Sequence, residues 1–387
     1  MEPVIYLDNN ATTRPAPEVV EALLPWLREQ YGNPSSSHVL GLQAEGALVQ
    51  ARAQVAALLG GQPAEIAFTS GGTEALNHAL RGAAEAFPAK RHLVTTAVEH
   101  SAVRALAGWL QRQGFEITVL GVDGEGRLDL AELEAALRPD TLMVALMAAN
   151  NETGVRFPVA EAAVRARRAG ALVAVDAVQA VGKVPVDVAA WGADLVAFSG
   201  HKFHGPKGVG GLWIRRGVRL RPFLVGGEQE RGRRGGTENL PGIVGLGKAA
   251  ELALAHLPDQ ERVADLRDRL ESLLREALPD LRIHGGGAER LPNTSLLALP
   301  DVEGEALQLR LSQRGICVST GSACTTGRPE PSHVLQAMGV PPDLARGTVR
   351  LSLGRETTAG EVEAVAIALP QVVQELRASG SMARRMR

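Results

Sequence analysis

The chain has 387 residues, 45% of them hydrophobic, and this length exceeds what one simple core usually holds, so it predicts two domains. Its formal net charge of −2 provides no basic field for nucleic acid, and its longest apolar runs are too short to cross a bilayer. The N-terminus lacks the basic and apolar regions of a secretory signal and only two cysteines occur, so we expect a cytoplasmic protein with free thiols.

Apolar strand-like runs alternate with amphipathic helical patterns in the first two thirds of the chain. The predicted strands lie at 65–69, 92–96, 115–120, 141–147, 171–175 and 194–198. The predicted helices lie at 73–87, 101–113, 130–137 and 159–168. Because the strands are almost continuously apolar, the alternation predicts an α/β fold, in which helices cover both faces of a mostly parallel sheet.

After Gly242 the pattern changes to that of an α+β domain. A long helical pattern with a break at Pro258 is followed by further short strands and helices, and the last residues are expected to fray. The predicted strands here are 293–299, 316–318 and 348–353, and the predicted helices are 304–313 and 358–376. We therefore expect a large domain over 15–255 and a small domain made of 1–14 and 256–387.

Lys202 stands in the polar segment Ser199–Lys207, directly after the apolar run Ala193–Phe198. Only five of the 41 basic residues are lysines, which makes its position at a strand end notable. An amine held there can lose its proton through desolvation and attack a carbonyl. A solvated lysine in a surface loop has the same local sequence, so this segment alone leaves both interpretations open.

Three further segments place polar groups where predicted strands end. Residues 69–74 open a helix whose amides and Thr73 hydroxyl suit a phosphate, although a simple glycine turn and helix cap would look the same. His100 is either a reactive group or an ordinary hydrogen-bonded histidine. Asp176, followed by Gln179, ends an apolar strand, where a carboxylate needs a cationic partner or hydrogen bonds. Ligands of open α/β sheets bind at this edge, so these groups are expected to meet there.

One cofactor needs this whole set of groups. Pyridoxal phosphate requires a lysine for its aldehyde, an acidic partner for its pyridine nitrogen and an anion site for its phosphate. Lys202, Asp176 and residues 69–74 provide these three groups. The sequence therefore predicts a pyridoxal phosphate enzyme.

These segments resemble the cysteine desulfurases, the NifS/IscS-like group of the class V aminotransferase family, which are pyridoxal phosphate enzymes of fold type I. The resemblance runs in order along nearly the whole chain, through 6–13, 32–38, 69–74, 99–100, 150–154, 175–179, 199–202, 234–239, 319–324, 330–333 and 349–352. It implies a large domain with a mostly parallel seven-stranded sheet flanked by helices, a smaller α+β domain, and a homodimer.

The resemblance also implies roles for the residues that bind the cofactor. Lys202 would hold pyridoxal phosphate covalently, Asp176 would pair with its pyridine nitrogen, and Gln179 would bond its ring hydroxyl. His100 would stack on the ring and shuttle protons. The remaining cofactor-binding residues implied are Gly72, Thr73, Asn151, Ser199 and His201, with Thr237 reaching the phosphate from the partner subunit.

For the substrate, the resemblance implies that Arg350 clamps the carboxylate of L-cysteine with help from Asn151 and Asn33. The reaction would depend on Cys324, which lies in the small, polar segment 319–328 of a mobile loop expected over about 319–333. Its thiolate would take the substrate sulfur as a persulfide, release alanine and pass the sulfur to an acceptor such as an iron–sulfur scaffold. Cys317, in an apolar run, fits a buried structural cysteine better. No metal is expected in the catalytic site, beyond a transient contact of Cys324 with an iron–sulfur cluster or its sulfur.

Two other interpretations remain open. An aminotransferase or a selenocysteine lyase of the same fold would keep Lys202 and Asp176 but would not need a thiol in a mobile loop. A catalytically silent sulfur-carrier subunit would keep the fold alone, although the complete set of Lys202, Asp176, His100, Arg350 and Cys324 argues against it. Neither alternative involves nucleic acid or a membrane.

Overall fold

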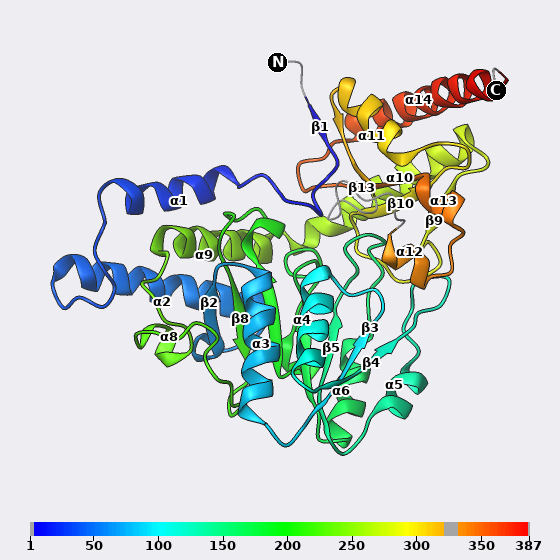
Figure 1. Ribbon diagram of the computed structural model, residues 1–387. Coiled ribbons are helices and arrows are strands. Elements are labelled where there is room, and N and C mark those ends of the chain that lie inside the picture. Colours follow the sequence, from blue (N-terminus) through cyan, green and yellow to red (C-terminus); the bar gives the residue numbers. More distant parts are fainter. Residues whose placement is uncertain (1–3, 321–331, 386–387) are drawn as a thin grey trace.

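The computed structural model describes residues 4–320 and 332–385 (Figure 1). Two layered units share these residues, one around a large sheet and one around a smaller sheet near the C-terminus. Cys324 lies outside the described residues, as does most of the loop predicted around it.

The larger unit is built on a seven-stranded sheet with the order β2-β8-β7-β6-β5-β3-β4. All neighbouring pairs from β7 to β4 are parallel, and only β8 runs against its neighbours β7 and β2. The strands are β2 (Ile66–Thr69), β3 (His92–Thr96), β4 (Glu116–Leu120), β5 (Thr141–Met147), β6 (Leu172–Asp176), β7 (Leu195–Ser199) and β8 (Gly210–Ile214). The expected mostly parallel, seven-stranded sheet is therefore confirmed.

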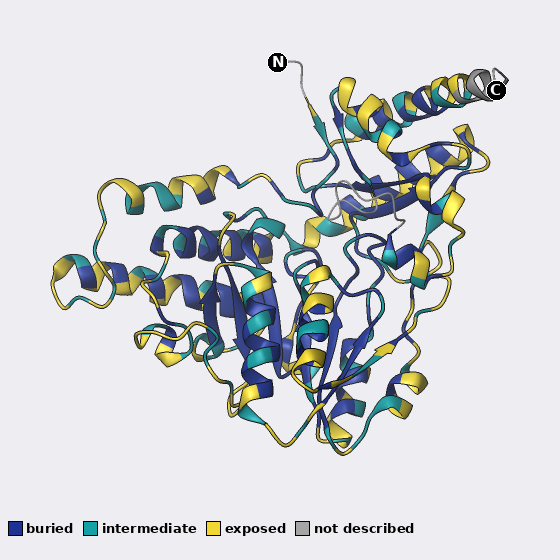
Figure 2. Cartoon of the chain, viewed as in Figure 1, coloured by how far each residue is buried: buried dark blue, intermediate teal, exposed yellow. Residues whose placement is uncertain are grey.

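Helices cover both faces of this sheet because its strands are buried on both sides (Figures 1 and 2). Alternate residues of the strands belong to two separate apolar cores, as shown by Val173 and Val175 on one face and Ala174 on the other. The helices α3 and α4 pack on the face of Ala174, and α2, α6 and α9 pack on the opposite face. The helices of this unit are α1 (Pro17–Arg28), α2 (Val39–Leu59), α3 (Gly72–Ala86), α4 (Ser101–Arg112), α5 (Leu130–Ala136), α6 (Val159–Arg168), α7 (Val188–Trp191), α8 (Gln229–Gly232) and α9 (Leu240–Ala255).

The smaller unit contains a four-stranded antiparallel sheet of order β12-β13-β10-β9. Its strands are β9 (Arg282–His284), β10 (Thr294–Ala298), β12 (Ser319–Thr320) and β13 (Thr348–Ser352), and β1 (Ile5–Tyr6) pairs separately with β11 (Ile316–Cys317). The helices are α10 (Gln260–Ala277), α11 (Gly304–Gln313), α12 (His333–Ala337), α13 (Pro342–Arg346) and α14 (Ala359–Arg385). A third apolar core joins Leu7 to residues between Val263 and Val373. This core agrees with a small domain that includes the N-terminal segment, while the boundaries at 14/15 and 255/256 stay predictions.

The sequence patterns missed several elements. Strand β8 carries two glycines and follows a glycine-rich turn, so it lacked the apolar run used to find the other strands. Its glycines are required by close packing, since a Cβ on Gly211 would lie 2.4 Å from the Phe198 ring. The C-terminus is also different from the prediction, because α14 continues to Arg385 where fraying was expected.

Candidate active site

A cavity of about 270 Å³ opens at the carboxyl ends of the large sheet's parallel strands. Ten of the residues predicted from the sequence line it together: Gly72, Thr73, His100, Asn151, Asp176, Gln179, Ser199, His201, Lys202 and Arg350. The rest of the lining comes from Asn10, Ala11, Leu76, Met147, Ala149 and Val178. Its apolar side chains suit a flat ring, and its polar side chains come from five strand ends of the large sheet, from the N-terminal segment and from the smaller unit.

Asp176 is the last residue of β6, and only 7% of it is exposed. Its Oδ1 accepts a hydrogen bond from the Val178 N–H at 3.0 Å. Burial raises the pKa of Asp176, while the Val178 N–H, His100 and Lys202 oppose this rise. A buried carboxyl at the wall of a cavity is suited to receive a cationic N–H from a ligand.

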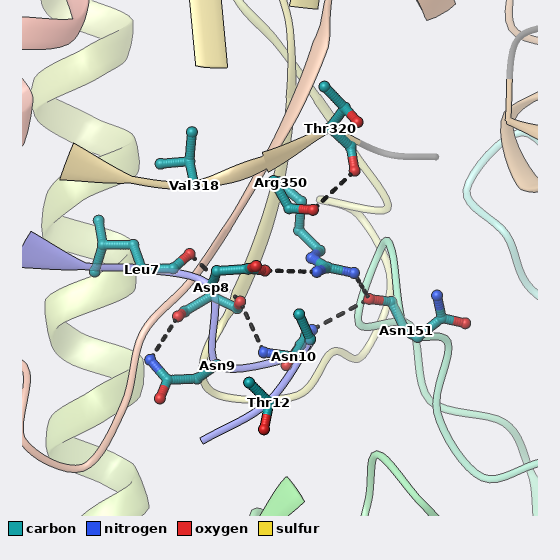
Figure 3. A network of polar contacts seen from close by, with 12 residues as sticks. Leu7, Asp8, Asn9, Asn10, Thr12, Asn151, Val318, Thr320 and Arg350 are labelled. Carbon is teal, nitrogen blue, oxygen red and sulfur yellow. Dashed lines mark hydrogen bonds and ion pairs between the residues drawn. The ribbon is translucent and has the colours of Figure 1, made fainter. Parts of the chain in front are cut away.

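Lys202 lies in the helical turn Gly200–Lys202 that directly follows β7. Its Nζ donates to the backbone oxygens of Asn10 at 2.5 Å and Ala11 at 2.9 Å. These acceptors are neutral carbonyls of the N-terminal segment, which crosses from the smaller unit to the sheet edge (Figure 3). Two backbone oxygens of the N-terminal segment thus help to hold the amine beside the cavity.

His100 forms the N-cap of α4, and its Nδ1 accepts the Ala102 N–H at 3.2 Å. In a neutral imidazole the proton is then carried by Nε2. Burial lowers the pKa of His100, and Lys202 lowers it further, whereas Asp176 acts in the opposite direction. At neutral pH the ring is therefore uncharged and offers one N–H donor.

The first turn of α3 borders the cavity through Gly72 and Thr73. Its N-cap residue, Gly71, has a φ of 151°, and no side chain caps the helix. A Cβ on Gly72 would lie 2.6 Å from Val178 Cγ2, so only glycine lets the helix approach so closely. The free amides of the first turn, with Thr73, Ser199 and His201 around them, favour a phosphate.

Arg350 reaches the cavity from β13 and is only 3% exposed (Figure 3). Its guanidinium donates to Asp8 Oδ1 and to the Asn151 backbone oxygen, each at 2.8 Å. Its buried Nε has no hydrogen-bond partner among the described residues. A guanidinium fixed on two sides with an unused donor matches a planar carboxylate ligand.

Three predicted residues do not join this cavity within the described chain. Thr237 is exposed in the segment after α8, which a Glu74–Arg234 ion pair of 3.0 Å ties to the start of α3. Asn33 is exposed, and its Oδ1 accepts the Ser35 N–H at 2.9 Å. Cys324 is outside the described residues, but the segments flanking it are described, with β12 before it and the helix cap Ser332 after it. Cys317 is half-buried on β11.

The sequence patterns did not single out Asn10 and Lys183 as site residues. The backbone oxygen of Asn10 accepts from Lys202 and from Gln179 Nε2, and its side-chain oxygen accepts from Lys183 at 2.9 Å. The available signal was the polar pair Asn9-Asn10 directly after the apolar run Val4–Leu7. For Lys183 the signal was a lysine within the small and apolar run 180–184 of a chain that has few lysines.

Comparison with known proteins agrees with this geometry. The family pattern described as Aminotransferase class-V matches residues 5–365. The chain belongs to the class-V aminotransferase family. Within the family it groups with cysteine desulfurases: Cysteine desulfurase 2 of Trichormus variabilis is 54% identical over 97% of this chain and 94% of that relative. Cysteine desulfurase of Klebsiella pneumoniae is 50% identical over 97% and 94% of the two chains.

Solved structures of this family share the fold. A NifS-like protein superposes with a TM-score of 0.91 at 41% identity and covers 96% of this chain and 99% of its own. The protein SspA in complex with cysteine superposes with a TM-score of 0.82 at 33% identity, over 92% of this chain and all of its own. The fold expected from the resemblance, that of the pyridoxal phosphate enzymes of type I, is confirmed.

The described residues contain neither a membrane-spanning helix nor a cluster of metal ligands. Within 4–320 and 332–385, no helix is both long and apolar enough to span a membrane. In the same part of the chain, no three histidine, cysteine, aspartate or glutamate residues cluster as metal ligands.

Proposed function

We propose that this class-V aminotransferase family member is a pyridoxal phosphate-dependent cysteine desulfurase, which converts L-cysteine to L-alanine and keeps the sulfur as a persulfide on Cys324. The observation that carries the proposal is the single cavity that joins Lys202, Asp176, the first turn of α3 and Arg350. These residues fit the cofactor in its chemistry, since an amine, a buried carboxyl and an uncapped helix start face one space. The cysteine desulfurases that are half identical to this chain support the reaction.

Each residue has a defined task in this proposal. Pyridoxal phosphate, when bound, supplies an electron sink that stabilises negative charge at the Cα of an amino acid. Asp176 would keep a proton on the pyridine nitrogen, and the α3 amides would hold the phosphate. Lys202 would bind the cofactor and, once displaced by the substrate amine, would take the Cα proton.

The substrate would be oriented by its carboxylate. Arg350 offers a buried guanidinium, and Asn151, whose backbone oxygen it already contacts, borders the same space. Placing the carboxylate there would direct the substrate side chain toward the Cys324 loop, because Arg350 lies on β13 next to β12. Strand β12 ends where that loop begins. Asn33 is proposed as a further substrate contact.

Cys324 would complete the reaction. Its thiolate would attack the substrate sulfur, the Cβ–S bond would break, and the bonding electrons with one proton would remain on the carbon product that becomes alanine. The new S–S bond would make a persulfide that a second thiol can attack. His100 would donate or accept the proton near these groups. We propose that the sulfur passes to an acceptor protein such as an iron–sulfur scaffold, in the cytoplasm.

We also propose a homodimer in which Thr237 reaches the partner's phosphate site. Large apolar side chains are exposed on and near α1 and α2 and on the segment before α8, a pattern typical of an interface. The most exposed are Leu27, Tyr31, Val39, Val49 and Val225, which are 64%, 79%, 68%, 59% and 88% exposed.

The test is to incubate the purified protein with L-cysteine labelled with ³⁵S and to measure alanine together with label on the chain. Stoichiometric alanine and a reducible label, without any keto acid, support the proposal. Amino transfer that depends on a keto acid would instead favour an aminotransferase, and selenocysteine as the only substrate would favour a lyase. A protein that holds cofactor but turns over none of these would be a silent carrier.

A further inference from the structure

Lys183 is a second lysine next to the cavity, and it does not contact the cavity directly. It lies in the turns after β6, and only 6% of it is exposed. Its Nζ donates to Gln179 Oε1 at 2.6 Å and to Asn10 Oδ1 at 2.9 Å. Both acceptors belong to residues that line the cavity, so Lys183 supports the lining from behind.

The contact with Gln179 determines which way its amide points. The Lys183 amine carries N–H donors in either protonation state and the amide oxygen only accepts, so the donor from Lys183 holds Oε1 toward the lysine. Nε2 of Gln179 is thereby turned away from Lys183, and one of its two protons goes to the Asn10 backbone oxygen at 3.0 Å. The second proton on Nε2 has no acceptor among the described residues, and Gln179 lines the cavity. The cavity is therefore offered a donor at this position.

Asn10 is oriented by the same lysine. Its Oδ1 accepts from Lys183 and from Asn293 Nδ2 at 3.0 Å, and its Nδ2 donates to Thr294 Oγ1 at 2.9 Å. This fixes the backbone of Asn10, whose oxygen accepts from both Lys202 and Gln179. One buried lysine amine thus holds both Gln179 and Asn10, and the Asn10 backbone oxygen in turn accepts from Lys202 and from Gln179.

The charges around Lys183 are mostly positive. Burial lowers the pKa of Lys183 well below its usual range, and Lys202 and Arg350 lower it further. Lys183 in turn helps to lower the pKa of His201 and of His204. Asp176 is the anion that acts on Lys202 and His100 at this edge, and Asp8 pairs with Arg350. The cations Lys202 and Arg350 line the same cavity as Gln179, so a negatively charged group of a ligand beside Gln179 would be stabilised.

We propose that Lys183 is a positioning residue that fixes the Gln179 amide with Nε2 toward the cavity, so that the ring oxygen of a bound pyridoxal phosphate is held as an anion. The inference rests on the proposed function. Its consequence concerns the linkage between Lys202 and the cofactor. A donor to the ring oxygen stabilises the deprotonated linkage more than the protonated one, where the linkage proton already neutralises that oxygen. Lys183 therefore lowers the pH at which the linkage loses its proton.

The experiment is a pH titration of the visible absorbance of the purified holoenzyme. Lys183→Met should move the midpoint upward by about one pH unit, the size of shift expected from one lost buried hydrogen bond. Lys248→Met, a change on a partly exposed lysine of α9 that pairs with Glu251, is the matched control and should leave the midpoint unchanged. Lys183→Leu serves if the methionine variant fails to fold, and we expect the same upward shift because leucine has no N–H to hold the Gln179 oxygen.

A second pair of variants tests whether Lys183 acts through Gln179. In a Gln179→Ala background, most of the shift caused by Lys183→Met should disappear, because the amide that it orients is gone. An unchanged midpoint in a folded Lys183 variant, or a shift that persists in full without Gln179, would overturn the inference. Wild-type protein without any visible absorbance, even after incubation with pyridoxal phosphate, would instead overturn the proposed function.

Discussion

Asp176 and Lys202 lie at the carboxyl ends of two neighbouring parallel strands, at one edge of the large sheet. Asp176 is the last residue of β6 and pairs in register with Ala197 of β7, and Lys202 lies in the helical turn directly after β7. The 25 residues between them fold away from this edge and return to it, so that a carboxyl and an amine face the same cavity.

Lys202 should carry the covalent link to the cofactor. Lys202→Ala should remove the visible absorbance of the purified protein, since no amine then remains to bind the aldehyde. Absorbance spectra before and after addition of pyridoxal phosphate measure this, with Lys248→Ala as the control. Full absorbance in the Lys202 variant would refute the assignment.

Asp176 should stabilise the charged pyridine ring. Asp176→Asn keeps the shape of the side chain but loses the negative charge that retains the ring proton. We expect alanine formation to slow by ~10²-fold or more, the scale reported for removal of one electrostatic stabiliser. Single-turnover formation of alanine measures the effect. Retained cofactor with an unchanged rate would show that the carboxylate has no such role.

Arg350 should bind the substrate carboxylate. Arg350→Lys keeps a positive charge but loses the planar pair of donors, so kcat/KM for L-cysteine should fall by about 10- to 100-fold. Arg346→Lys on α13, whose arginine pairs with Asp343 at the surface, provides a matched control. Equal kcat/KM values for the two variants would contradict the proposed contact.

Cys324 should receive the sulfur. Cys324→Ser should still bind pyridoxal phosphate and L-cysteine but should yield no alanine under turnover, because a hydroxyl is too weak a nucleophile for the substrate sulfur. Alanine analysis and ³⁵S labelling measure the outcome, and Cys317→Ser is the control that should stay active. Normal alanine formation by the Cys324 variant would transfer the role to Cys317 or to no enzyme thiol.

Glu99 should make stability depend on pH. It is fully buried, Oε1 accepts from Thr96 Oγ1 and the Met147 N–H, and Oε2 has no described partner. Burial raises the pKa of Glu99 from its ordinary value of 4.5 to about 8. The folded state therefore holds a proton that the unfolded chain releases, so Glu99 lowers stability as pH rises from 4.5 toward 8.

Glu99→Gln removes this titration while it keeps the acceptor Oε1. Between pH 5 and pH 8 the free energy of unfolding of wild type should therefore fall relative to that of the variant, by at most ~1.4 kcal/mol per pH unit. Denaturant unfolding at several pH values measures both curves. Parallel curves would mean that Glu99 does not carry a proton in the folded protein.

The sequence predicted most of the large sheet because its strands are apolar runs with sharp ends. His92–Thr96 and Thr141–Met147 form strands over the predicted residues, and Gly304–Gln313 forms the predicted helix. Strand β8 was missed because it begins with two glycines and so lacks the expected apolar run. At Gly211 a side chain would clash with the Phe198 ring. Helix α14 runs past the predicted end at residue 376. Small and basic residues there suggested a frayed tail, but they continue the helix to Arg385.

The sequence by itself indicated Lys202, Asp176, His100 and the turn at 69–74, because each follows an apolar run and strand ends of a parallel sheet share one edge. Only the tertiary structure decided how those groups are supported. Asn10 and Arg350 are 340 positions apart in the chain, yet both line the cavity, and Lys183 orders its wall from behind. Such long-range contacts depend on the packing of two units, and no local pattern of residues records them.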